Sequence, residues 1–125
     1  MKVKNLFRKL FQREYTLNRV RDKITVKEGN EVLPLYVDCD AATIIIKLQK
    51  ANKALLDIKP EADRETRIRA ARELAVAMFG EEQAEQLFEF YHNDENCVVT
   101  ICGMYFSDPV NGLNKKITKA QKKRK

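Results

Sequence analysis

The chain has 125 residues, of which 44% are hydrophobic and 34% charged, a balance that is typical of one folded domain and argues against a disordered protein. No apolar run approaches the roughly 20 residues of a membrane-spanning helix, so no transmembrane segment is predicted. The net charge of +6 is segregated: residues 1–25 carry eight Lys and Arg against two acids, residues 114–125 carry seven against none, and the acidic residues predominate between them.

The N-terminal arm, residues 1–22, is predicted to contain a basic amphipathic helix. Its apolar residues fall on one side of a helical projection: Val3, Leu6, Phe7, Leu10 and Phe11. Basic residues, including Arg8 and Lys9, lie opposite. Charged and apolar positions interleave, which is not the pattern of a secretion signal. Three roles stay open for this helix: packing on the domain, lying on an anionic membrane surface, or binding a protein partner.

Residues 23–113 are predicted to form a single, mainly α-helical domain that begins with a β-hairpin over 23–37. Ile24 and Val26 alternate with polar residues, and Gly29 and the asparagine after it mark the turn. Pro34 has no N–H to donate, so the second strand is expected at a sheet edge.

About four helices are predicted after the hairpin, at 41–57, 61–79, 81–92 and 94–106. Their ends carry ordinary signals. Either of two aspartates, Asp38 or Asp40, is expected to cap the first helix, and Pro60 suits the first turn of the second. Gly80 is expected to end the second helix in a left-handed conformation. Asn93 or Asp94 is expected to cap the last helix.

The C-terminal arm, residues 114–125, is predicted to be a disordered basic tail. Ile117 and Ala120 are its only apolar residues, which is too little to bury in a folded structure. Its lysines would point in all directions around a helix: Lys115, Lys116, Lys119, Lys122, Lys123 and the last residue.

No constellation of residues indicates catalysis, a metal or a cofactor. His92 is the only histidine, and a cation at the end of a helix has a structural explanation. Cys39, Cys97 and Cys102 lack the spacing of metal ligands, and reduced thiols in a cytoplasm are expected. The four glycines are scattered, so no phosphate-binding loop is predicted. The protein is therefore not expected to be an enzyme.

Several segments resemble the small tail assembly chaperones of long-tailed, siphovirus-type phages and prophages of Gram-positive bacteria. The resemblance covers about 38–125 and depends on four short segments: Phe79–Tyr91, Asn93–Asp94, Tyr105–Phe106 and the lysine-rich ending at 115–123. It implies a mostly helical protein of the bacterial host cytoplasm that coats the tape-measure protein before the tail tube forms, without catalysis or cofactor. The basic segment at 1–22 is not an evident requirement of that family.

A chaperone for a long apolar helix needs an exposed apolar groove, repeated by many copies along the client. We hypothesise that some of six side chains line such a groove, while the alternative is that all six form the core: Phe79, Leu87, Phe88, Tyr91, Tyr105 and Phe106. Self-association is left open. The alternative function is a small accessory protein that binds nucleic acid through the two basic arms, without sequence specificity.

Overall fold

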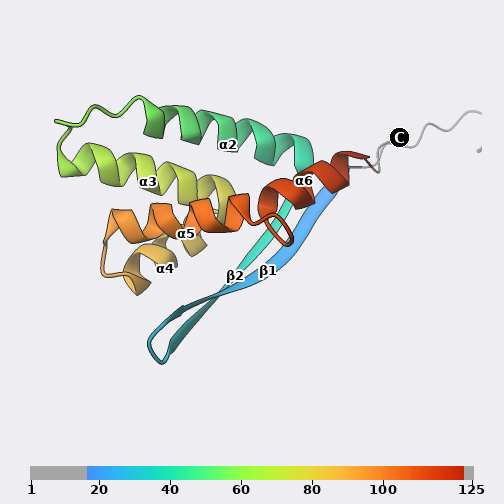
Figure 1. Ribbon diagram of the computed structural model, residues 1–125, viewed down its shortest axis with the longest axis horizontal. Coiled ribbons are helices and arrows are strands. Elements are labelled where there is room, and N and C mark those ends of the chain that lie inside the picture. Colours follow the sequence, from blue (N-terminus) through green and yellow to red (C-terminus); the bar gives the residue numbers. More distant parts are fainter. Residues whose placement is uncertain (1–16, 123–125) are drawn as a thin grey trace, which may run out of the picture.

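The computed structural model describes residues 17–122, so the predicted N-terminal helix with Arg8 and Lys9, and also Lys123, lie outside the described residues. Within 17–122, a β-hairpin precedes five helices (Figure 1): β1 (Arg19–Glu28), β2 (Glu31–Asp40), α2 (Ala41–Leu56), α3 (Arg64–Phe79), α4 (Glu81–Phe90), α5 (Glu95–Ser107) and α6 (Leu113–Lys122). The predicted mainly helical fold with an N-terminal hairpin is confirmed, and the difference is one additional helix.

The hairpin is longer than the predicted 23–37, because β1 and β2 pair in antiparallel register over ten residues each. One face of the ribbon is buried against the helices through Val20 and Val26 on β1 and Leu35 and Val37 on β2. The ribbon passes beneath the helices, and its turn projects beyond them (Figure 1). Gly29 has a φ of 60° in this turn, which glycine adopts without steric cost.

The outer edge of β2 is bound by a side chain of α4. The backbone N–H of Tyr36 donates to Oε1 of Gln83, and Nε2 of Gln83 donates to the carbonyl oxygens of Tyr36 and Phe79, each at 2.7 Å. One amide group therefore connects the strand to the end of α3. Pro34 is two residues before Tyr36 and faces the same outer edge, as its missing N–H predicts.

The starts of α2 and α3 follow aspartate signals. Asp40, one of the two aspartates predicted as the cap, caps α2 by accepting from the N–H of Thr43. The prediction that the next helix begins at residue 61 was wrong, because Asp63 caps α3 by accepting from the N–H of Thr66. Gly80, with a φ of 85°, ends α3 as predicted and directly precedes α4.

Helix α4 ends two residues before the predicted position. His92 and Asn93 have φ values of 53° and 61°, so the chain leaves the helical conformation after Phe90. Asp94 then caps α5 by accepting from the N–H of Asn96. The turn lies at the predicted junction, but its backbone conformation sets the boundary.

The predicted disorder of residues 114–125 was wrong for 114–122, because these residues belong to α6. The prediction began the tail one residue too late and left out Leu113. With that residue, Leu113, Ile117 and Ala120 form a stripe at positions i, i+4 and i+7, and all three are buried. The stripe gives the helix an apolar face to pack on the domain, and most of its lysines stay exposed.

Candidate functional site

Five of the six predicted partner-binding residues lie in the core, which contradicts the hypothesis that they line an exposed groove: Phe79, Leu87, Phe88, Tyr91 and Tyr105. The rings of Phe79 and Tyr105 stack with their centroids 5.9 Å apart. These side chains pack α3, α4 and α5 against the hairpin. Their close packing with one another excludes water from the core. Phe106, which is half-buried, is the one member of the six that lies beside an open groove.

The hydroxyl group of Tyr105 connects three elements. It donates to Oδ2 of Asp22 on β1 at 2.7 Å, and Oδ1 of Asp22 lies 3.7 Å from Nζ of Lys116 on α6. Burial, together with the hydrogen bond to Asp22, raises the pKa of Tyr105, so the phenol stays protonated. Lys116 therefore helps to attach α6 to the hairpin, although the sequence analysis predicted that it belongs to a disordered basic tail.

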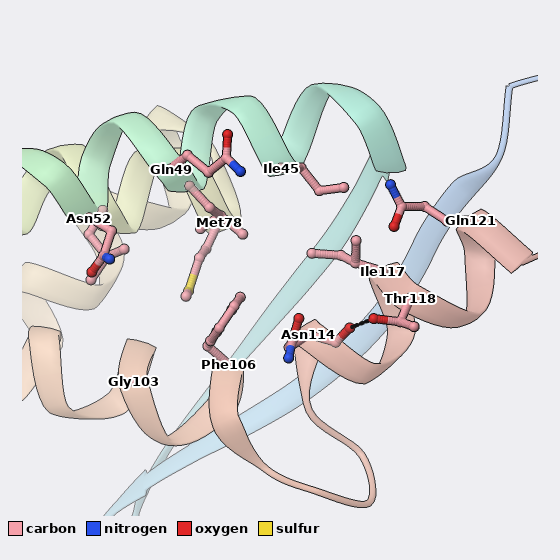
Figure 2. Close-up of a pocket in the computed structure, with 12 residues that line it drawn as sticks. Ile45, Gln49, Asn52, Met78, Gly103, Phe106, Asn114, Ile117, Thr118 and Gln121 are labelled. Carbon is pink, nitrogen blue, oxygen red and sulfur yellow. Dashed lines mark hydrogen bonds between the residues drawn. The ribbon is translucent and has the colours of Figure 1, made fainter.

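An open groove with a volume of about 380 Å³ lies over α3, between α2 on one side and α5 and α6 on the other (Figure 2). Its apolar lining comes from all four helices: Ile45, Leu48, Leu74, Met78, Phe106 and Ile117. Its polar lining consists of neutral side chains: Gln49, Asn52, Asn114, Thr118 and Gln121. The groove therefore has an apolar floor and an uncharged polar rim.

The backbone of α5 borders the groove at Gly103. This glycine is exposed, and a methyl group added to it would meet no atom within 4 Å. In Figure 2, the side chains of Met78 and Phe106 point toward the space between α2 and α5, and Ile117 points toward α2. Leu56, which is 77% exposed, follows Asn52 by one turn of α2 and extends the apolar character along the same face.

Few features of the sequence indicated this groove. Gln49 and Asn52 are ordinary exposed positions of an amphipathic helix, and the α6 wall was predicted to be disordered. A regular apolar stripe from Leu113 would have revealed the missing helix. The lining side chains include no ionisable group, so the groove is suited to bind apolar surface rather than to perform acid–base chemistry.

A second cavity is basic. It lies where the start of β1 meets α6 and is lined by Arg19, Arg21, Lys116 and Lys119, among others. Two of the cations share one acid, because Nε of Arg19 is 2.9 Å and Nε of Arg21 is 3.4 Å from Oδ1 of Asp38. The hydrogen bond from Arg19 lowers the pKa of Asp38, so this carboxylate stays charged and offsets part of the positive charge.

The thiols of Cys97 and Cys102 are held in their neutral form. Burial raises the pKa of Cys102 to about 12, and burial, followed by the neighbouring Asp94, raises the pKa of Cys97. In residues 17–122 the structure contains no group of three or more His, Cys, Asp and Glu side chains that could hold a metal ion. His92 is exposed in the turn between α4 and α5.

In the described part of the chain, no helix is both long enough and apolar enough to cross a membrane. Comparison with models of protein families, with curated proteins and with solved structures yields no match to this chain.

Proposed function

We propose that this protein is an assembly chaperone of a phage tail that holds an apolar helical segment of the tape-measure protein in the groove between α2, α5 and α6. The observation that carries the proposal is the open groove itself, with its apolar floor and neutral rim. The sequence resemblance supplies the identity of the client, and the bacterial host cytoplasm is the compartment in which such a client is synthesised. The proposed site differs from the buried aromatic residues first expected.

The dimensions of the groove fit a weak, repeated interaction. Its volume of about 380 Å³ accommodates a few side chains of a helix, not a whole helix. A helix that lies in a groove inserts side chains from one face at positions i, i+3, i+4 and i+7. Many copies along one long client convert weak single contacts into strong overall binding. This mode of action requires reversible contacts and no chemical step.

Co-expression with fragments of the tape-measure protein from the same genome tests the proposal. The variant Gly103→Leu places a side chain in the groove at a position with open space, and leucine favours a helix over glycine by about 0.8 kcal/mol. We expect the fold to be retained and the soluble complex to be lost. Gln86→Leu is the matched control, because it adds a leucine at an exposed position of α4 that does not line the groove.

The outcome of the co-expression decides the matter. Recovery of the complex with Gln86→Leu but not with Gly103→Leu supports the proposal. If no fragment of the client co-purifies with the unchanged protein, or if Gly103→Leu retains full binding, the groove is not a client site. A charge at Phe88 is not a suitable test of client binding, because Phe88 is 2% exposed and a buried aspartate there would unfold the domain.

The basic cavity at β1 and α6 favours non-specific nucleic-acid binding as a second candidate function. Arg19, Arg21, Lys116 and Lys119 place four cations around one opening. Such binding would contact phosphate groups, and its affinity would fall steeply as salt concentration rises. Deleting 114–125 is not a clean test, because α6 belongs to the core. The charge reversals Arg21→Glu and Lys119→Glu, both at exposed positions, should instead abolish a mobility shift on DNA or RNA.

A further inference from the structure

In the two helices that form opposite walls of the groove, all charged residues are basic. Neither α2 nor α6 contains an Asp or Glu, and together they carry seven lysines: Lys47, Lys50, Lys53, Lys115, Lys116, Lys119 and Lys122. Asp40 before α2 and Asp108 before α6 accept hydrogen bonds from the backbone of their own turns. Within these two walls of the groove, every charged side chain is therefore positive.

Helical geometry places some of these lysines along the rim. Lys53 follows the lining residue Gln49 by four positions on α2, and Lys122 follows the lining residue Thr118 by four positions on α6. Residues four apart in a helix lie on the same side, one turn above the other. Both lysines are exposed, and neither forms an ion pair with another residue of the described chain. Each is free to contact a charge on a bound segment.

We propose that the groove binds an amphipathic helix whose apolar stripe is flanked by Asp and Glu. The stripe would contact Ile45, Met78 and Phe106, and the flanking carboxylates would face Lys53 and Lys122. The lining along α2 runs from residue 45 to residue 52, which corresponds to about 10 Å, or two turns, of a bound helix. This inference rests on the proposed function and specifies the chemical class of the client segment.

The same charges exclude the protein's own N-terminal segment as the preferred occupant. Residues 1–14 have a suitable apolar stripe but carry five Lys and Arg against one Glu. Those cations would meet the lysines of α2 and α6, and like charges in proximity weaken binding. The groove would thus bind an acidic client segment in preference to the basic N-terminal arm of this chain.

Two peptides with one apolar stripe test the inference. The first is the native segment of residues 1–14, and the second is the same peptide with its Lys and Arg replaced by Glu. Binding of each labelled peptide to the full chain is measured by fluorescence anisotropy at about 0.1 M and about 0.5 M salt. We expect the acidic peptide to bind about tenfold more tightly than the native peptide at low salt, and the difference to shrink at high salt.

The variant with Lys53→Glu and Lys122→Glu should lower the affinity for the acidic peptide by about fivefold to tenfold and raise that for the native peptide, because each exposed charge pair contributes a small factor. Lys27→Glu at the end of β1 is the control, and it should change neither affinity. Equal affinities, tighter binding of the native peptide, or no binding of the acidic peptide overturns the inference. If the peptide experiment overturns the inference but Gly103→Leu still abolishes capture of the tape-measure fragment, the proposed function stands. If Gly103→Leu does not abolish capture, both the proposed function and the inference fail.

Discussion

The side of the helical layer that packs on the hairpin (the closed side) and the side that contains the groove (the open side) are built from different kinds of residue. On the closed side, α3, α4 and α5 bury Phe79, Phe88 and Tyr105 against the hairpin. On the open side, α2, α5 and α6 leave a groove with an apolar floor, which includes Phe106, and neutral polar side chains on its rim. Most of the large aromatic side chains of the sequence therefore build the scaffold. The surface available for binding is made of less conspicuous residues.

The largest effect is expected from damage to the closed side. Leu87 is fully buried, and Leu87→Ala should lower the free energy of unfolding by about 2–5 kcal/mol, because it removes buried apolar surface and leaves a cavity. Leu56→Ala, at an exposed position near the groove, should change stability by less than about 0.5 kcal/mol. Chemical denaturation of both variants measures the contrast. Similar losses of unfolding free energy in the two variants would show that the closed and open sides do not differ in their contribution to stability.

The junction of α5 and α6 is expected to be sensitive to a single methyl group. A Cβ at Gly112 would overlap the backbone of Tyr105 and Asp108, so Gly112→Ala should destabilise the protein by about 1–3 kcal/mol and displace α6. Gly103→Ala is the matched control, because its methyl group meets open space and alanine should stabilise α5 by about 0.8 kcal/mol. Thermal unfolding compares them; a Gly112→Ala variant as stable as the unchanged protein would refute this packing.

The hydroxyl group of Tyr105 links the closed side to α6, through Asp22. Tyr105→Phe should lower the free energy of unfolding by about 1–2 kcal/mol, because Asp22 loses a hydrogen-bond donor in a partly buried site. Tyr36→Phe is the control, since Tyr36 is exposed and its hydroxyl group forms no hydrogen bond with the described residues. Equal stability of the two variants in urea titrations would contradict a structural role for this link.

The smallest effect is a pH dependence at the start of α6. Asp108 accepts hydrogen bonds from the N–H groups of Val110 and Asn111, and these bonds lower its pKa in the folded state. A lowered pKa means that the stabilisation is present above the unfolded-state value of about 3.9 and is lost as the pH falls through the lower folded-state value. NMR signals of α6 should therefore broaden below about pH 4 before those of α4. Asp108→Asn should weaken this dependence, and an unchanged pH profile in that variant would disprove the assignment.

The sequence predicted the local features that depend on single residues. An aspartate cap at residue 38 or 40 and a glycine with positive φ at Gly80 could be predicted, because both depend on local backbone chemistry. The start of α3 was misplaced because Pro60 and Asp63 are both plausible start signals, and only the hydrogen bond to Thr66 distinguishes them. Boundaries are the least secure part of such predictions, because tertiary packing also influences them.

The candidate site was harder to predict, for a physical reason. An apolar side chain has the same periodicity whether it faces a core or a groove, so the burial of Phe79, Leu87 and Tyr105 could not be read from spacing. The groove exists because α6 reaches α2, and that contact depends on Leu113 and Ile117 packing on distant residues. Neighbouring residues in the sequence do not contain that information.

The amide of Gln83 has a consequence for how copies of this protein can associate. By satisfying both the N–H and the carbonyl of Tyr36, it occupies the point at which another strand would add to β2. Pro34, the preceding residue with the same outward orientation, offers no N–H there. Two successive positions along this margin are closed to sheet extension, so growth of an amyloid-like stack from it is blocked. Association of copies of this chain by pairing at this edge of β2 is therefore disfavoured.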